Sequence, residues 1–342
     1  MPINVMIVDD SAFMRKVLSD MLSSDPNINI IAKLQNGAEA VKQAAKLDPD
    51  VITMDVNMPE MDGLSALTKI MADSPRPVVM VAASQDHEMV VKCLEAGAVD
   101  FMVKPSGEIS LDMKTLESEL ILKVKTAATA KIKHYAAQKI EHRQFYGAMK
   151  KIVVIASSTG GPQTLEHVIP LLPGNIPACV LCVQHMPPGF TKSLAERFSH
   201  ISELVVKEAE DGDEILPGKV LIAPGDYHME VKREITRGFA KDIIRLNKEE
   251  KECGVRPSAN WTMRSVAEIY GERVIGVVLT GMGSDGTDGA RKIKEYGGTV
   301  LAQDKESCII YGMPKCVIEA GYYDEIVPLS KLPVALVQIL EL

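Results

Sequence analysis

Short apolar runs rich in Val and Ile alternate with amphipathic stretches along most of this chain. Such runs are typical of strands buried on both faces of a parallel sheet, and the amphipathic stretches are typical of helices that cover a sheet. In the first part of the chain the pattern predicts strands at residues 4–8, 28–32, 51–54, 78–81 and 99–103. It predicts helices between them at residues 12–22, 37–47, 63–71 and 88–96. Five such β-α repeats imply a parallel sheet with helices on both faces.

The pattern changes after the fifth predicted strand. Residues 111–133 contain good helix formers throughout, and we expect part of this segment to close the first domain as its fifth helix. Residues 134–149 are polar and basic without apolar periodicity, which indicates a linker that is helical rather than flexible. We therefore expect a first domain at 1–125, a linker at 126–149 and a second domain at 150–342.

The β-α alternation resumes in the second half of the chain, with longer connections. Apolar runs there predict strands at residues 152–156, 178–183, 203–206, 219–223, 274–280 and 299–302. This pattern predicts a doubly wound α/β domain. We also expect this domain to contain a small antiparallel hairpin, with His228 between its two short strands.

The composition is that of a soluble globular protein, with 46% apolar and 25% charged residues. A formal net charge of −8 argues against a nucleic-acid partner or an anionic membrane surface. No apolar run approaches the ~20 residues needed to span a bilayer, so we expect no membrane insertion. The six cysteines are scattered, mostly within apolar segments, which favours reduced core thiols and a cytoplasmic location.

Acidic residues follow the predicted strands of the first domain. The first strand runs into Asp9 and Asp10, the third runs into Asp55, and the fifth ends at Lys104. Because ligands bind beyond the carboxyl ends of parallel strands, these side chains should meet at one edge of the sheet. Three carboxylates there require a cation, and Mg²⁺ is the hard ion that takes such oxygen ligands. A metal ion and a lysine are also what the formation of an aspartyl phosphate requires.

The motifs MIVDDSAFMR, ITMDVNMPEMDGL and DFMVKP resemble the receiver domain of two-component response regulators. The resemblance covers about residues 1–125 and implies a flavodoxin-like (βα)5 fold. It implies that a chemotaxis histidine kinase phosphorylates Asp55, and that Lys104 contacts the phosphoryl group. Asp9, Asp10, Asp55 and the carbonyl oxygen of Asn57 would surround Mg²⁺, and Phe101 would occupy the aromatic switch position.

One position departs from the receiver pattern. Receivers usually carry Ser or Thr at the end of the fourth strand, where Ala82 stands here. Ser84 would face the same side if the strand continued. We expect phosphorylation to survive this change, and its coupling to the rest of the domain to be weakened.

Three strands of the second domain end in residues that a serine hydrolase requires. The strand at 152–156 is followed by Ser157, Ser158 and Thr159, the strand at 178–183 by His185, and the strand at 274–280 by Asp285. If these strands are parallel neighbours, a hydroxyl, an imidazole and a carboxylate emerge at one edge of the sheet. Histidine then takes the serine proton, and the carboxylate fixes the imidazole tautomer. The pattern by itself does not choose between Ser157 and Ser158.

Other residues compete for these roles. His228 is a second candidate base, and Asp288 and Asp304 are alternatives to Asp285. The turn that contains Met282 and Gly283 exposes backbone N–H groups, which could form an oxyanion hole together with the Gly160-Gly161 turn.

The motifs ASSTGGP, VQHMPPGFTKSLAERF, EAEDGDEILPG, IAPGDYHME, LTGMGSDGTDG and AQDKESCIIYGMP resemble the catalytic domain of chemotaxis protein-glutamate methylesterases. The resemblance covers nearly all of residues 150–342. It implies that Ser158 is the nucleophile, His185 the base and Asp285 the acid. It places Thr159 and the Met282 N–H at active-site and oxyanion positions, with Gly283 beside them. Two departures are that Ala156-Ser157 replaces the usual Gly-Ala, and that Asn260 stands where the family often has Asp, which bears on the substrate mouth.

The resemblance implies hydrolysis of γ-glutamyl methyl esters on methylated chemoreceptors and deamidation of particular receptor glutamines, which gives sensory adaptation. It implies no metal for hydrolysis. Because a receiver is joined to a hydrolase through a short linker, our hypothesis is that the unphosphorylated receiver covers the active-site mouth and that phosphorylation of Asp55 loosens this packing. Two other functions stay open. A second domain that only binds receptor or kinase is disfavoured by the intact set of Ser158, His185 and Asp285. A nucleotide-binding domain is disfavoured because neither GxxxxGK[ST] nor GxGxxG is present.

Overall fold

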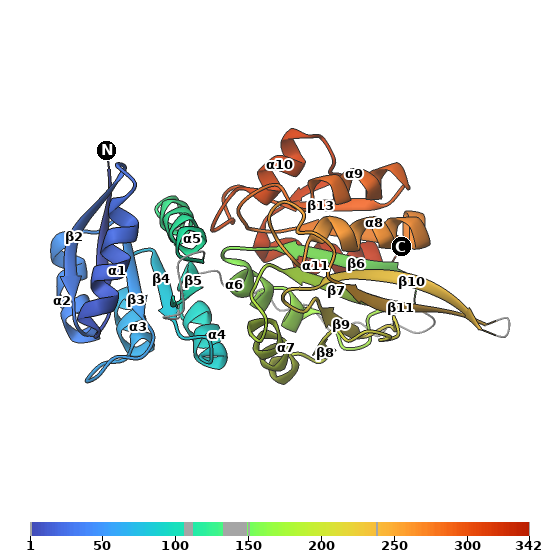
Figure 1. Ribbon diagram of the computed structural model, residues 1–342. Helices are drawn as coiled ribbons and strands as arrows, with labels where there is room; N and C mark the ends of the chain where they lie inside the picture. Colours follow the sequence, from blue (N-terminus) through green and yellow to red (C-terminus); the bar gives the residue numbers. More distant parts are fainter. Residues whose placement is uncertain (1, 106–111, 133–148, 150, 237–238, 342) are drawn as a thin grey trace. The chain divides into compact units, whose positions relative to one another are not determined.

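The computed structural model describes residues 2–105, 112–132, 149, 151–236 and 239–341 (Figure 1). The chain divides into two compact units, Met1–Ile132 and Lys133–Leu342. Most of the predicted linker, residues 133–148, lies outside the described residues. Within the described part, no helix has the length and apolarity that crossing a bilayer requires.

The first unit is a five-stranded sheet with the order β2-β1-β3-β4-β5, in which all neighbours are parallel. This is the flavodoxin-like order, so the predicted fold is confirmed. Its strands are β1 (Ile3–Val8), β2 (Ile28–Leu34), β3 (Val51–Asp55), β4 (Val78–Ala82) and β5 (Asp100–Val103). Its helices are α1 (Ala12–Ser23), α2 (Gly37–Leu47), α3 (Gly63–Asp73), α4 (His87–Glu95) and α5 (Asp112–Ala127).

Side chains at the strand-helix junctions explain where the first three helices begin. The side chains of Ser11, Asn36 and Asp62 accept hydrogen bonds from backbone N–H groups in the first turns of α1, α2 and α3. Such caps satisfy donors that have no partner within the helix. Strands β3 and β4 are buried along their whole length, which agrees with their continuous apolar sequence.

The second unit contains a seven-stranded sheet with the order β14-β13-β12-β6-β7-β9-β8 and a separate antiparallel pair, β10-β11. Neighbours in the large sheet are parallel throughout, which confirms the doubly wound α/β prediction. Its strands are β6 (Lys151–Ser157), β7 (Ala178–Gln184), β8 (Val205–Glu208), β9 (Lys219–Ile222), β10 (His228–Thr236), β11 (Phe239–Asn247), β12 (Val274–Val278), β13 (Thr299–Gln303) and β14 (Glu325–Val327). Its helices are α6 (Gly161–Glu166), η1 (Ile169–Leu171), α7 (Phe190–Ile201), α8 (Ala259–Tyr270), η2 (Gly271–Arg273), α9 (Thr287–Glu295), α10 (Met313–Glu319), η3 (Leu329–Lys331) and α11 (Leu332–Glu341).

The hairpin differs from its prediction. His228 is the first residue of β10, not a residue between two short strands, and β10 and β11 are each nine residues long. They form the long ribbon drawn in yellow in Figure 1. In the sequence, the many charged residues of both strands obscure the apolar pattern. Met229, Val231 and Ile244 form an apolar face that belongs to the core. This face packs against α8.

The order of the central strands positions the candidate catalytic residues. Strand β6 lies between β12 and β7, and both pairs are parallel. Ser157 at the end of β6 is in register with Gln184 at the end of β7. The segments that follow β12, β6 and β7 therefore leave the sheet at the same edge.

Candidate active site

The acidic residues of the first unit lie together at the carboxyl edge of its sheet. Oxygen atoms of Asp9, Asp10 and Asp55, one from each, lie within 4.8 Å of one another. Lys104 Nζ lies 3.1 Å from Asp9 Oδ2 and 2.7 Å from Asp55 Oδ2. Three carboxylates around one point form an oxygen donor set that suits a hard divalent cation.

Burial and the neighbouring charges shift the pKa values of Asp55 and Lys104. Burial raises the pKa of Asp55 to about 6; the hydrogen bond from Lys104 opposes this shift, and the charge of Asp9 adds to it. Burial by itself lowers the pKa of Lys104, but the bonds with Asp55 and Asp9 outweigh burial and leave that pKa raised. Lys104 therefore carries its positive charge directly beside Asp55.

The receiver resemblance also assigned roles to Asn57, Ala82 and Phe101. Asn57 donates from its backbone N–H to Asp55 Oδ1 over 3.3 Å and from its amide to Asp86 over 2.9 Å. Ala82 is fully buried at the end of β4, and its carbonyl accepts from the Lys104 N–H. Phe101 is buried on β5, with the Lys123 ammonium 5.7 Å from the centre of its ring.

In the second unit the two serines after β6 have different environments. Ser157 is fully buried and donates its hydroxyl to Gln184 Oε1 over 2.7 Å. Ser158 is partly exposed, and its backbone N–H donates to the Thr280 carbonyl just after β12. The Ser157 hydroxyl is thus engaged within the core, and Ser158 is the serine at the surface of the strand edge.

Two glycines allow the chain to pack closely around Ser158. Gly160 has φ +75°, which favours glycine, and a Cβ on Gly161 would lie 1.9 Å from Gln184 Oε1. A Cβ on Gly281 would lie 2.7 Å from Ser158 Cβ, so the loop after β12 contacts Ser158 directly. The Gly161 N–H donates to the Ser158 carbonyl, which removes this N–H from the set of oxyanion donors.

His185 follows β7 and is held by backbone contacts with β6. Its N–H donates to the Ser157 carbonyl over 3.1 Å, and Gln184 Nε2 donates to the carbonyl groups of both Ser158 and His185. Its ring faces the loop after β12, because Nε2 lies 2.7 Å from Asp285 Oδ2. The structure thus pairs the predicted base with the predicted acid, and Ser158 directly follows β6, the strand that pairs with β7.

Asp285 is almost fully buried and accepts several hydrogen bonds. Besides His185, its donors are the Ser258 hydroxyl at 2.7 Å and the backbone N–H groups of Ala259 at 2.6 Å and Asn260 at 3.1 Å. These N–H groups belong to the first turn of α8, where the helix dipole also favours a negative charge. Burial raises the pKa of Asp285, but the bonds from His185, Ser258 and Ala259 outweigh this and hold that pKa below its ordinary value. Asp285 is therefore ionised.

The competing residues have other partners. His228 is fully buried, accepts from the Ser258 N–H at Nδ1, and contacts the Glu250 carbonyl through Nε2. Asp288 pairs with Arg264 and Arg291, and Asp304 accepts hydrogen bonds from Ser307.

Of the candidate oxyanion residues, Met282 and Gly283 lie in the loop after β12, and Thr159 lies in the segment after β6. Met282 is partly buried, and Gly283 is exposed with φ +87°. Thr159 is buried, and its carbonyl accepts from the Thr280 hydroxyl over 3.1 Å. Thr280 therefore connects the segment after β6 to the segment after β12.

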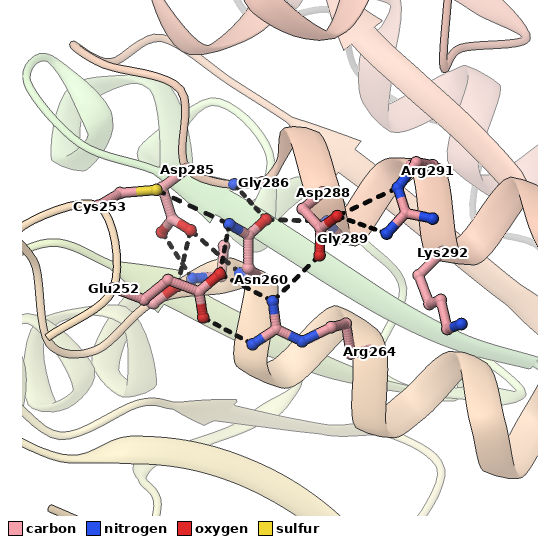
Figure 2. A network of polar contacts seen from close by, with 12 residues as sticks. Glu252, Cys253, Asn260, Arg264, Asp285, Gly286, Asp288, Gly289, Arg291 and Lys292 are labelled. Atoms are coloured by element: carbon pink, nitrogen blue, oxygen red, sulfur yellow. Dashed lines mark hydrogen bonds and ion pairs between the residues drawn. The ribbon is translucent and has the colours of Figure 1, made fainter. Parts of the chain in front are cut away.

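Asn260 lies beneath the Asp285 loop, and its exposed fraction is 2%. Its side chain contacts the backbone of this loop and Glu252 (Figure 2). Asn260 therefore lies inside the protein, bonded to the segment that directly follows Asp285, and not at the surface.

Two family profiles match this chain. One described as CheB methylesterase matches residues 153–336, and one described as Response regulator receiver domain matches residues 5–115. A protein-glutamate methylesterase/protein-glutamine glutaminase of Pyrococcus abyssi is 46% identical over 99% of this chain and 94% of its own length. The chain belongs to the CheB methylesterase family. The resemblances seen in both halves of the sequence are thereby confirmed.

Further relatives come from Thermotoga maritima. Its protein-glutamate methylesterase/protein-glutamine glutaminase is 47% identical over 98% of both chains. The crystal structure of the Thermotoga maritima CheB methylesterase catalytic domain is 56% identical and covers 55% of this chain and 98% of that one, with a TM-score of 0.53.

Buried polar residues that the sequence analysis did not single out support the strand ends of this CheB family member. Gln303 Oε1 accepts from the Thr280 N–H over 2.8 Å, and Gln184 bonds to Ser157, Ser158 and His185. Both glutamines directly follow a buried apolar run, in the tripeptides VQH and AQD. This position at a strand end is the signal that could have identified them. The role of Ser258 carries no comparable sequence signal.

Proposed function

We propose that this chain hydrolyses glutamate methyl esters on methylated chemoreceptors and deamidates specific receptor glutamines, with Ser158 as nucleophile, His185 as base and Asp285 as acid. Its relatives over the full chain carry both activities in their names, protein-glutamate methylesterase and protein-glutamine glutaminase. The observation that carries the residue assignment is the bond between His185 Nε2 and Asp285 Oδ2, two residues that follow the strands on either side of β6, which Ser158 directly follows.

The bond to Asp285 supports a separate role for each nitrogen of His185 in this proposal. Because Nε2 donates to the ionised Asp285, Nδ1 is left as the unprotonated nitrogen that takes the Ser158 proton. The serine oxygen attacks the ester carbonyl. As the tetrahedral intermediate collapses, the protonated His185 gives its proton to the leaving group, which departs as methanol, or as ammonia from a glutamine. Water then hydrolyses the acyl-enzyme, and His185 acts as base again.

Backbone N–H groups around Met282 and Gly283 stabilise the oxyanion in this proposal, with Thr159 beside them. The close contact between Gly281 and Ser158 supports this assignment, because it brings the loop to the nucleophile. Loss of one oxyanion donor typically costs about 3 kcal/mol of transition-state stabilisation.

Phosphorylation of Asp55 by a chemotaxis histidine kinase controls the hydrolase in this proposal, and the output is sensory adaptation. The carboxylates of Asp9, Asp10 and Asp55 and the Asn57 carbonyl would hold Mg²⁺, and the convergence of the three carboxylates supports this proposal. When bound, Mg²⁺ neutralises charge on the phosphoryl group during its transfer. Lys104 adds a second positive charge beside Asp55. Because the proposed partners are a chemotaxis kinase and chemoreceptors, we expect the protein to be cytoplasmic.

The test is a demethylation assay on methylated receptor, with and without a phosphodonor. Methanol release by the wild type that is stimulated by the phosphodonor and lost in Ser158→Ala is the expected result. Receptor binding without methanol release would instead identify a binding module.

A further inference from the structure

The Asn260 side chain joins three segments of the second unit (Figure 2). Its Oδ1 accepts from the N–H groups of Gly286 at 3.0 Å and Gly289 at 2.8 Å, which flank the start of α9 just after Asp285. Its Nδ2 donates to Glu252 Oε1 over 3.0 Å, and its own backbone N–H donates to Asp285 Oδ1. One residue therefore binds the Asp285 carboxylate and the backbone N–H groups of Gly286 and Gly289.

Glu252 is itself held as an acceptor. Its two oxygens pair with Arg264, at 2.7 Å and 2.6 Å, and Arg264 also reaches Asp288. The bond with Glu252 raises the pKa of Arg264, so this guanidinium remains charged. A fixed carboxylate opposite Nδ2 and two fixed N–H groups opposite Oδ1 match the two ends of an amide and of no other side chain of this size.

We propose that Asn260 is a positioning residue for Asp285 and that Glu252 fixes its orientation. The proposal rests on the catalytic role of Asp285 proposed above. Asn260 and Glu252 hold the Asp285 loop at the first turn of α8, and Asp285 in turn orients the His185 ring. At this position, where the family often has Asp, the requirement for an amide in this chain comes from Glu252: its carboxylate faces Nδ2, and two N–H groups face Oδ1.

The isosteric change Asn260→Asp isolates this requirement. Aspartate keeps an acceptor for Gly286 and Gly289 but turns a second carboxylate oxygen toward Glu252 Oε1, where the amide donor was. Repulsion then displaces the Asp285 loop, and small displacements of a catalytic group reduce kcat by about tenfold to hundredfold. We expect KM to change little, because Asn260 is buried and does not contact substrate.

A second change should restore the match. In Asn260→Asp/Glu252→Gln, the glutamine amide can donate to the new aspartate, so the donor and acceptor are exchanged between the two positions. Arg264 then loses its bond to Oε1 but keeps the glutamine carbonyl oxygen at one nitrogen and Asp288 at the other. We therefore expect the double variant to recover most of the kcat that Asn260→Asp loses.

The experiment measures kcat and KM on methylated receptor, using the full chain with a phosphodonor. The variants are Asn260→Asp, Glu252→Gln, Glu252→Ala and the double variant. The matched control is Asn29→Asp, which makes the same change at an exposed asparagine of the first unit. Thermal unfolding of each variant separates loss of fold from loss of positioning.

A fall in kcat for Asn260→Asp at constant KM, reversed in the double variant, supports the proposal. An unchanged kcat in Asn260→Asp, or a double variant no better than Asn260→Asp, overturns it. If Asn260→Asp does not fold, Glu252→Ala decides: a lower kcat supports the pairing and an unchanged kcat refutes it. The proposed function fails by a different result, namely full methanol release by Ser158→Ala.

Discussion

Nε2 of His185 lies 2.7 Å from Oδ2 of Asp285. His185 follows β7, and Asp285 follows β12. Strand β6 lies between these two strands, so Ser158 emerges between the imidazole and the carboxylate in the order of the sheet. The first turn of α8 supplies Asp285 with two backbone donors and the Ser258 hydroxyl. The pairing of the Asp285 carboxylate with the imidazole therefore depends on three separate parts of the chain: the segments after β7 and β12, and the start of α8.

The two neighbouring serines should respond differently to loss of their hydroxyl groups. We expect Ser158→Ala to reduce kcat by about 10⁴-fold or more, because it removes the nucleophile. Ser157→Ala removes a buried hydrogen bond to Gln184, so it should lower the free energy of unfolding by about 1 kcal/mol and leave most of the activity. Methanol release and thermal unfolding of both variants check this. Inactivity of a fully folded Ser157→Ala beside an active Ser158→Ala would reverse the assignment.

The charge of Asp285 is expected to matter more than its shape. Asp285→Asn would place an amide among three N–H or O–H donors and His185, so one of these contacts becomes donor against donor. We expect kcat to fall by about 10⁴-fold at an unchanged fold. Asp288→Asn tests the competing carboxylate, which is partly exposed and paired with arginines, and should retain most of the activity. Equal losses in the two variants would show that Asp285 has no special role.

Sequence reasoning reached the strand ends but not their order. The apolar runs before Ser158, His185 and Asp285 identify three buried strands, yet nothing in the sequence places the strand at 274–278 beside that at 151–157. The role of Asn260 was also out of reach, because its partners Gly286 and Gly289 lie 26 and 29 residues away. The lengths of β10 and β11 were missed because charged residues alternate with their few core residues.

His228 should make the second unit sensitive to acid. Burial lowers the pKa of His228 below 6.5, since the neutral ring accepts from Ser258 at Nδ1 and is packed against Trp261. Below pH 6.5 the unfolded chain binds a proton that the folded chain refuses, so stability is fully present above this pH and falls as the pH decreases toward the folded-state pKa.

The single tryptophan of the chain, Trp261, allows this to be measured. Thermal unfolding followed by its fluorescence reports the second unit. We expect the midpoint to fall between pH 7 and pH 5, and to fall less in His228→Gln, even if that variant is less stable at pH 8. An equal pH dependence in the two proteins would exclude His228 as the source.

Ala82 should limit the response to phosphorylation. This residue is fully buried at the end of β4, and its methyl side chain offers no hydroxyl to a phosphoryl group on Asp55. We expect Ala82→Thr to show a larger ratio of stimulated to basal methanol release than the wild type, measured with the same small-molecule phosphodonor. The basal rates should be alike, because the second unit is unchanged, and Asp55→Asn should abolish stimulation in both backgrounds. Equal stimulation of the wild type and Ala82→Thr would mean that the Lys104 contact with Asp55 is sufficient to transmit phosphorylation.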